Sequence, residues 1–340
     1  MNKIIPLIIL VVLSFASALF AEEAVVVYID GWVDIKDKSG SLVEAWEGDP
    51  LYTGESIITD EASFAELEKG NNEAIIKIAP ETVFTLGEID DAGEKRTVLS
   101  TALGSVSYKF NKTVGREPYI STPSIVAGVR GTEFTVFAGV DGSTLVAVES
   151  GQVDVRAEGE TVELYPDEGV EVMTGEKPGD KFEVIRGKID YSTWNDDRFA
   201  SFLADPETGA RRVQKQLITY AEEIDAILPE YEAVSEKVDE NRQTYRELRD
   251  KDEEEATAYY AEQVEPHVLL AGSLYRNLRH YSLSALSLRR YVLGRLYMEM
   301  KSRYITDLDN PVFLGFLTIY EQSLKLFEDT ITPLLVEADI

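Results

Sequence analysis

Two patterns of hydrophobic residues divide the chain. Between residue 24 and about residue 188, apolar residues occur in short runs that alternate, or nearly alternate, with polar ones, as in residues 74–78 and 132–137. Alternation places successive side chains on opposite faces of a β-strand. Glycine-containing turn sequences separate these runs. The pattern is typical of a sandwich, a barrel or a β-solenoid.

A short motif recurs within this first half. Gly31, Gly104 and Gly151 each begin a segment of the form Gly-x-Val-x-apolar. Glycine can adopt the turn conformation that would precede each strand, and the alternating apolar side chains would then enter one face. The spacing is too irregular for a repeat array. We therefore expect stacked, quasi-repeated β units.

The pattern changes to helical spacing from about residue 205. Asp205 and Pro206 are typical of a helix start, with a capping side chain and a proline in the first turn. Apolar residues then recur at intervals of three and four, most clearly over residues 313–331. Pro229 is expected to interrupt the pattern, and Pro266 to bend or break it. These signals predict an all-α bundle of four or five helices.

The predicted fold class is therefore α+β multidomain. An N-terminal all-β domain over residues 24–188, built as a sandwich or in a β-solenoid-like manner, precedes a C-terminal helical bundle over residues 205–340. The linker between them, residues 189–204, is too rich in aromatic residues for a free tether and should pack between the domains. Both halves are acidic, so a simple charge-driven contact between them is not expected.

Residues 1–21 have the features of a secretion signal. Lys3 supplies a positive charge, an apolar stretch follows, and small residues provide cleavage sites after Ala18 or Ala21. The alternative is an uncleaved anchor, although the apolar stretch is short for a membrane span. Cleavage would leave an exported protein, periplasmic or associated with the outer surface, without a transmembrane span. The oligomeric state is not predicted.

Charge and composition narrow the function. The chain has 33 Lys and Arg against 62 Asp and Glu, which gives a net charge of −29. Such acidity argues against nucleic acid and anionic lipid as partners. The absence of cysteine and the presence of only two histidines exclude a His- or Cys-based zinc site. Common catalytic and nucleotide-binding motifs are also absent, so we expect neither an enzyme nor a cofactor.

The most distinctive motif lies in residues 121–136. It combines a Thr-Pro pair with Gly-x-Arg-Gly-Thr-x-Phe, and a Val-x-Glu-x-Gly-x-Val segment follows. Together with Gly-Asp, Thr-Gly and Ala-Pro-x-Thr elements upstream, residues 25–175 resemble the FecR-like periplasmic domain family. The resemblance implies an exported, β-rich domain of the kind known from iron-citrate signalling across the bacterial envelope. Its motif residues here are Thr122, Pro123, Gly128, Arg130, Gly131, Thr132, Phe134, Glu149 and Gly151.

The resemblance implies that this motif is architectural. Arg130 has a functional alternative, since the arginine fork fits carboxylates and could contact an anion or ligand. We favour a structural role in which Arg130 ties adjacent strands together. The acidic segment of residues 90–94 lacks the spacing of an EF-hand and is interpreted as a solvated turn.

The helical half contains an unusually basic segment, residues 270–304. Its arginines could form a face for partner docking, with candidates Arg276, Arg279, Arg289 and Arg290. We favour an intramolecular role in which they pair with the acidic residues 253–255 of the preceding helix.

These inferences leave three functional hypotheses. The first is a non-catalytic binding or scaffold module for another envelope protein or a polysaccharide. The second is a membrane-anchored periplasmic sensor coupled to outer-membrane transport signalling. The third is a carbohydrate-acting enzyme whose acidic residues cannot be singled out among so many. Classical family members carry a cytoplasmic segment that engages a sigma factor. The residues before this β domain resemble only a signal peptide, so direct sigma-factor regulation is not expected.

Overall fold

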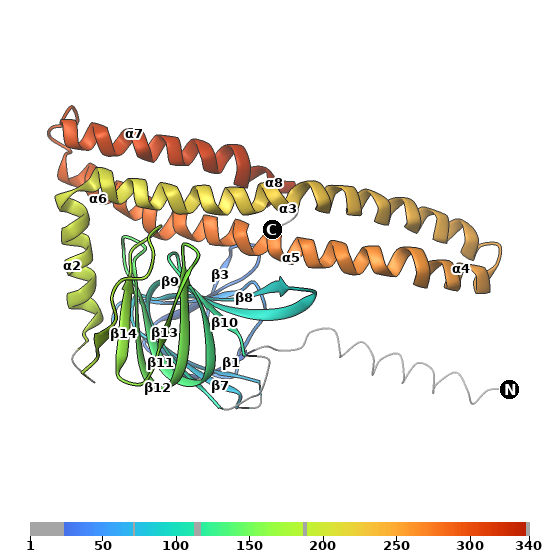
Figure 1. Cartoon of the computed structure of the whole chain (residues 1–340), viewed down its shortest axis with the longest axis horizontal. Helices are drawn as coiled ribbons and strands as arrows, with labels where there is room; N and C mark the ends of the chain where they lie inside the picture. Colours follow the sequence, from blue (N-terminus) through green and yellow to red (C-terminus); the bar gives the residue numbers. More distant parts are fainter. Residues whose placement is uncertain (1–23, 71, 112–116, 186–188, 338–340) are drawn as a thin grey trace.

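The computed structural model describes residues 24–70, 72–111, 117–185 and 189–337. The predicted signal peptide and both cleavage sites therefore lie outside the described residues. Strands fill the first part of the described chain and helices the second, as the hydrophobic pattern predicts (Figure 1). None of the helices in these ranges combines the length and apolar character that crossing a bilayer requires.

The strands join into one large hydrogen-bonded sheet. Along its main path their order is β15-β14-β12-β11-β10-β9-β7-β6-β1-β4, and β2, β3, β5, β8 and β13 pair from the side. The strands are β1 (Ala24–Asp30), β2 (Val33–Lys36), β3 (Leu42–Glu44), β4 (Pro50–Leu51), β5 (Ser56–Thr59), β6 (Phe64–Lys69), β7 (Ala74–Ile78), β8 (Val83–Asp91), β9 (Glu94–Phe110), β10 (Tyr119–Ser121), β11 (Val126–Ala138), β12 (Thr144–Ala157), β13 (Glu160–Leu164), β14 (Glu168–Val172) and β15 (Phe182–Glu183).

Long strands change partners along their length, which lets the sheet fold over a single apolar core. The first part of β9 pairs with β8, whereas its last part lies between β7 and β11. The change occurs at Gly104, whose φ of +99° is readily accessible only to glycine. In the core, the ring of Phe134 stacks on Tyr108 with centroids 5.1 Å apart.

The recurring Gly-x-Val motif marks three such backbone positions. Gly31, Gly104 and Gly151 all have positive φ angles, of +87°, +99° and +82°. The prediction that each glycine adopts a turn conformation is confirmed. The valines two positions later, Val33, Val106 and Val153, are fully buried, as the alternation predicts.

A hydroxyl side chain occupies the space beside each of these glycines. A Cβ atom at Gly31 would collide with Ser63, and one at Gly104 would collide with Thr82. The Ser63 hydroxyl accepts a hydrogen bond from the Trp32 N–H at 2.9 Å, and Thr82 accepts one from Ser105 at 3.0 Å. In both cases the donor is the residue after the glycine. The glycine thus allows a serine or threonine to bind the backbone at the bend.

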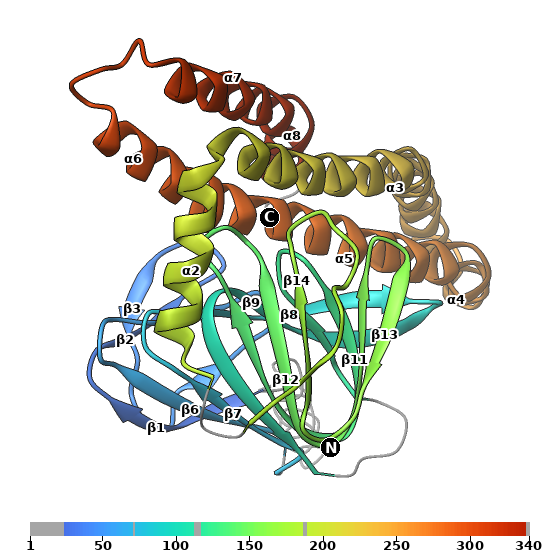
Figure 2. The same cartoon turned by 60° about the vertical axis from the view of Figure 1, so that its left-hand side comes forward.

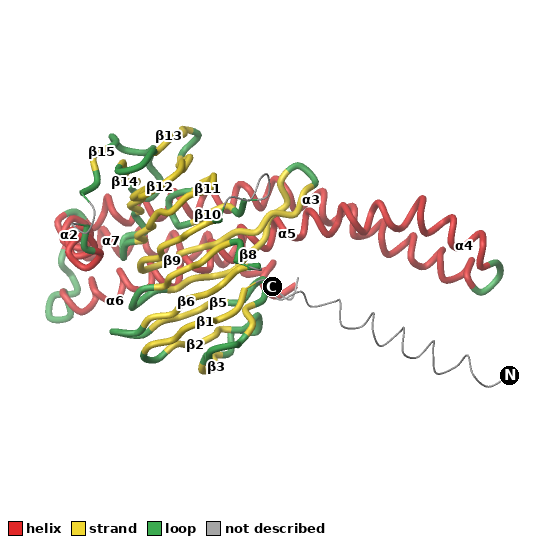
Figure 3. The backbone as a smooth tube through the Cα atoms, turned by 90° about the horizontal axis from the view of Figure 1, so that it is seen from below, coloured by secondary structure: helices red, strands yellow, loops and turns green. Residues whose placement is uncertain are grey.

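The helices form a second layer over the sheet. They are α2 (Tyr191–Ala204), α3 (Pro206–Arg249), α4 (Glu253–Tyr259), α5 (Glu265–Ser287), α6 (Gly294–Arg303), α7 (Pro311–Leu326) and α8 (Thr332–Glu337), with π-helical segments η1 (Tyr260–Val264), η2 (Leu288–Leu293) and η3 (Phe327–Ile331). In Figure 1, α5 lies next to the sheet, α3 lies above it, and α7 lies above α3. The far halves of α3 and α5, with α4, project beyond the sheet, and we call them the projecting arm (Figures 1 and 3).

The continuity of the helices differs from the prediction. Pro229 lies inside α3, which runs unbroken for 44 residues, so its predicted interruption is wrong. Pro266 follows the π-helical η1, in the first turn of α5, so the chain remains helical on both sides of it. Within the described residues, the apolar core of the helical part is built mainly by α3, by the helix running from α5 to α6, and by α7. Phe202 of α2 also belongs to this core.

The aromatic linker is a helix that packs against both layers. Asp190 caps α2, and α2 runs down the side of the β domain (Figure 2). Tyr191 stacks on Phe137 of β11 with centroids 6.0 Å apart, and its hydroxyl donates to the Ala138 carbonyl at 3.0 Å. At the other end, Phe202 meets Phe316 of α7 edge to face. The aromatic residues therefore join the two layers.

We predict that Gly151→Ala destabilises the β domain whereas Gly128→Ala does not. A Cβ at Gly151 would lie 2.6 Å from the Gly131 carbonyl oxygen in a backbone with positive φ, whereas no atom lies within 4 Å of one at Gly128. We expect Gly151→Ala to lower the free energy of unfolding by about 1–3 kcal/mol, and Gly128→Ala to change it by less than about 1 kcal/mol. Urea unfolding of both variants measures this, and equal losses would contradict it.

Candidate functional site between the two layers

The candidate site is built where α5 crosses the tip of the β8–β9 hairpin. Arg276 of α5 donates to the Asp90 carboxylate at 2.9 Å. The next residue of α5, Asn277, accepts from the Asp90 N–H at 2.7 Å through its side-chain oxygen. The Asp90 side chain is only 6% exposed. Two neighbouring residues of α5 thus bind the backbone and the side chain of one hairpin residue.

The surroundings of Asp90 keep it ionised. Burial alone would raise the pKa of its carboxyl, but hydrogen bonds from Arg276, Ser273 and the Gly93 backbone outweigh burial and lower the pKa. The neighbouring Asp91 accepts from the Tyr119 hydroxyl at 2.5 Å. Interpreting residues 90–94 as a solvated turn is therefore wrong for both aspartates. The two carboxylates join this turn to the helix and to β10.

Further ion pairs connect the layers along α3. Lys215 lies 2.5 Å from the Glu158 carboxylate, and Arg212 lies 2.7 Å from Glu176. The expectation that two acidic halves make no charge-driven contact is therefore wrong. Net charge describes each half as a whole, whereas these contacts depend on single basic residues placed opposite single acidic ones. Most of these pairs are partly exposed, so each contributes little alone.

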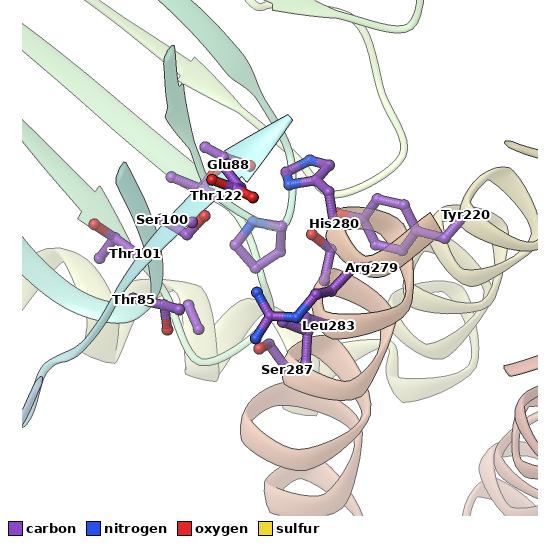
Figure 4. Close-up of a pocket in the computed structure, with 15 residues that line it drawn as sticks. Thr85, Glu88, Ser100, Thr101, Thr122, Tyr220, Arg279, His280, Leu283 and Ser287 are labelled. Atoms are coloured by element: carbon purple, nitrogen blue, oxygen red, sulfur yellow. The ribbon is translucent and has the colours of Figure 1, made fainter. Parts of the chain in front are cut away.

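A cavity of about 50 Å³ lies between α5 and the sheet. Figure 4 shows His280 and Arg279 of α5 facing Glu88 and Thr122 of the β domain. Pro123, the second residue of the Thr-Pro pair, also lines it. One end of the family motif therefore faces the helical layer. The remaining residues of the lining are Thr85, Gly87, Ser100, Thr101, Ala102, Ser121, Tyr220, Leu283, Ser284 and Ser287.

His280 is a histidine of the cavity lining whose charged form is disfavoured by burial. Burial lowers the pKa of its imidazole to about 4, because a low-polarity environment disfavours the charged form. The ring of Tyr281 lies edge-on at 5.3 Å between centroids. At neutral pH the cavity therefore contains an uncharged imidazole beside the cationic Arg279.

The motif residues lie mainly in structural positions. The Thr122 hydroxyl bonds Thr144 at 2.6 Å and accepts from the N–H groups of Ser124 and Ile125 at 3.2 Å, which fixes the turn before β11. Phe134 is fully buried in the core. These contacts organise the β domain itself.

The glycine and threonine of the motif form a backbone bulge. Gly131 has a φ of +56°, and the pairing of β11 with β12 shifts register between Arg130 and Glu133 and again between Glu133 and Phe134. Thr132 is buried against Gly151. Gly128, by contrast, lies in regular strand pairing with open space above its Cα. Gly128 therefore does not mark a close approach of another backbone segment.

Arg130 and Glu149 lie on the exposed surface. Within the described part of the chain, the Arg130 guanidinium makes no hydrogen bond or ion pair. The favoured role for Arg130, tying adjacent strands, therefore has no support from the contacts found here. Arg130 is not among the residues that line the cavity.

The basic residues of the helical half do not pair as expected. Among the described ion pairs, none joins them to the acidic residues 253–255. Arg276 pairs with Asp90 instead, and the Arg289 guanidinium lies over the ring of Phe327 at 4.9 Å. Arg279 and Arg290 line a second cavity. The intramolecular role expected for these arginines holds for Arg276 and Arg289, with different partners.

Within the described residues, His, Asp and Glu side chains form no group of three that could hold a metal ion. The geometry of this site is instead that of a contact between two layers, fixed by ion pairs around a small polar cavity. That the chain is not an enzyme stays a prediction.

The comparisons with known proteins agree with this architecture. Residues 55–154, which include most of the motif and the bends at Gly104 and Gly151, match the family model described as FecR protein. The chain carries a FecR domain. The comparison with curated proteins finds no match. The FecR domain is thus the layer on which α5 rests, and Asp90 belongs to it.

Two solved structures are also similar. Both are crystal structures, at 1.65 and 2.50 Å resolution, of a candidate anti-sigma factor from Parabacteroides distasonis ATCC 8503. Each is 17% identical, with TM-scores of 0.35 and 0.33. The matches cover 41% and 38% of this chain and 63% and 59% of those chains. This chain therefore spans less than two thirds of their length.

The site residues that the sequence did not reveal come from two distant segments. The sequence did not distinguish Asn277 and His280 from the other polar residues of the basic helix. It also predicted that Asp90 would lie in a solvated turn. The only available signal was the isolated Asp-Asp pair at a hairpin turn opposite a helix rich in arginine. Which arginine would face which aspartate depends on the docking of the two layers, and no local pattern encodes that.

We predict that His280 makes stability fall as the pH drops from about 6.5 to 4. An unfolded chain protonates histidine at about pH 6.5, whereas the folded chain resists protonation until about pH 4. Over that range the unfolded state binds more protons and is favoured. His280→Gln should reduce the loss between pH 7 and pH 4.5 by about 1–3 kcal/mol. Urea unfolding at both pH values provides the measurement.

His267→Gln is the matched control, because His267 lies on the projecting arm, where its ring nitrogen is 2.7 Å from the Gln263 carbonyl oxygen. This variant should keep the pH dependence of the wild type. The explanation would be wrong if His280→Gln retained the full loss of stability, or if both variants reduced it equally.

Proposed function

We propose that this protein is a regulatory sensor of the bacterial envelope that acts by binding other proteins, and that it is not an enzyme. The observation that carries the proposal is the direct attachment of its FecR domain to a long helix through Asp90 and Arg276. FecR domains belong to signalling proteins. A sensor needs a mechanical connection between the domain that detects a partner and the segment that reports it, and α5 provides one.

The projecting arm is the part of the protein suited to pass the signal on to another protein. It is built from two antiparallel helical segments joined by the turn before α4, and it extends beyond the edge of the sheet (Figure 1). Leu269, Leu270 and Tyr260 on it are 66%, 40% and 40% exposed. Large exposed apolar side chains gathered on one element are typical of a protein-binding surface. Helix α5 continues from the arm to Arg276. A partner that binds the arm and shifts α5 would therefore also alter the contact between Arg276 and the FecR domain.

The β domain also has an exposed apolar edge, which lies just before the residues that match the FecR model. Strand β3 pairs only with β2 among the described strands, and its Leu42 and Val43 are 59% and 60% exposed. Trp46 follows at 64% exposed. An open edge strand with apolar side chains favours a partner that adds a strand. This observation also supports the simpler scaffold role, in which the domain holds another envelope protein without signalling.

Export is part of the proposal and rests on the sequence. The features of residues 1–21 support secretion, with the N-terminus either removed or kept as a membrane anchor. The strong negative charge supports an exposed, soluble surface in the periplasm or outside the cell. A sensor that reports across the inner membrane would require the anchored form.

We predict that the Arg276–Asp90 contact is needed for signalling. The gene would be deleted in its own bacterium and transcripts compared with the parent. Deletion should change a restricted set of transcripts, which the wild-type gene restores and the Arg276→Ala gene largely fails to restore. Arg211→Ala is the matched control, because Arg211 forms an exposed ion pair with Glu207 within α3. It should restore the wild-type transcripts.

Immunoblots would verify equal amounts of the variants. If Arg276→Ala does not accumulate, Asp90→Asn tests the same contact from the other side while keeping nearly the same shape. Deletion without any change in transcripts would contradict the sensor role and leave the scaffold. Full restoration by both variants would contradict transmission through this contact.

A further inference from the structure

A second cavity, of about 170 Å³, lies beside the first, between the β2–β3 hairpin and α5. Four basic residues line it: Lys36 and Lys38 from the hairpin, and Arg279 and Arg290 from the helical layer. In a chain with a net charge of −29, such a concentration of positive charge is unexpected. We call these four residues the cationic pocket.

The charges of the cationic pocket are not neutralised within the protein. Across the described residues, the side chains of Lys36, Lys38, Arg279 and Arg290 form no ion pair and no hydrogen bond. Asp37 is the acidic residue in the lining, and its carboxylate already accepts from the Ser39 hydroxyl at 2.6 Å and the Ser41 N–H at 2.9 Å. Four positive charges against one negative leave the cavity strongly positive.

Two observations indicate that the fold holds these cations together against their repulsion. Gly54, with a φ of +92°, leaves the space that the Arg279 guanidinium occupies, since a Cβ there would collide with it. Burial and the nearby Arg290 lower the pKa of the Lys36 ammonium group. Like charges brought together at a cost in stability are typical of a site that receives an opposite charge.

The walls also offer neutral hydrogen-bond donors. The hydroxyls of Ser56 and Thr85 lie 2.8 Å from each other, and Ser287 of α5 lies on the opposite wall. Arginine, lysine and hydroxyl donors converging on one cavity suit an oxyanion with several acceptor oxygens and more than one charge. A cavity holding one water needs only about 10–15 Å³, so this one has room for a larger group.

We propose that the cationic pocket binds a phosphate group, either free phosphate or one carried by a small molecule. A phosphate matches this lining better than a single carboxylate, which neutralises one charge and accepts from fewer donors. The bound anion would bridge β2 and α5 and so stabilise the contact between the layers. Anion binding does not depend on the proposed signalling role. It can be measured with the purified chain alone, so either proposal can fail without the other.

Isothermal titration of the purified full chain with inorganic phosphate and pyrophosphate tests this. We expect saturable binding of one anion per chain and a rise in the midpoint of thermal unfolding. Arg290→Gln should weaken binding about tenfold or more, since it removes one charge-assisted donor. Arg295→Gln is the matched control, because Arg295 is an exposed arginine on the following helix α6. It should change the affinity by less than about twofold.

Gly54→Ala gives a second test without removing a charge, since it displaces Arg279 from the cavity. It too should weaken binding, with circular dichroism verifying that the fold remains. Absence of saturable binding to either anion overturns the proposal, as does equal weakening by Arg290→Gln and Arg295→Gln. Malonate distinguishes the chemistry, because tighter binding of this dicarboxylate than of phosphate would overturn the assignment to a phosphate group.

Discussion

The docking of α5 on the β8–β9 hairpin determines how the two layers of this protein are positioned against each other. Arg276 and Asn277 bind the same residue, Asp90, through its side chain and its backbone. Because the Asp90 carboxylate is almost fully buried, losing one partner would leave a charge without compensation, which costs more than the intact pair contributes. Both cavities lie beside this contact. Their shapes depend on where α5 rests.

The β domain, which contains the FecR match at residues 55–154, contacts this helix through its β8–β9 hairpin. Its long strands bend at glycines, and serine or threonine hydroxyls hold the backbone at two of those bends. The bends let one sheet fold over its own core, so the β8–β9 hairpin extends to the helical layer. The family motif thus mainly builds the domain, whereas the Arg276–Asp90 contact between the layers lies outside it.

The sequence predicted what local patterns encode. Alternation, helical spacing and the three Gly-x-Val segments predicted the strands, the helices and the positive φ angles of Gly31, Gly104 and Gly151. Pro229 was misjudged because packing over a 44-residue helix outweighs the cost of one proline. The partners of Arg276 and the role of Asp90 were missed because the two residues are far apart in the chain. They meet only when the two layers are docked. The same docking gathers the four basic residues of the second cavity.

Hydrogen exchange at the Asp90 amide tests the central claim most directly. This N–H donates to Asn277 of α5, so its protection depends on the helix staying docked. The account predicts slow exchange in the wild type and much faster exchange in Arg276→Ala, while the Tyr108 amide in the core remains protected in both. Exchange at Asp90 as fast as in an exposed turn of the wild-type protein would contradict it, since the two layers would then not be held together at this contact.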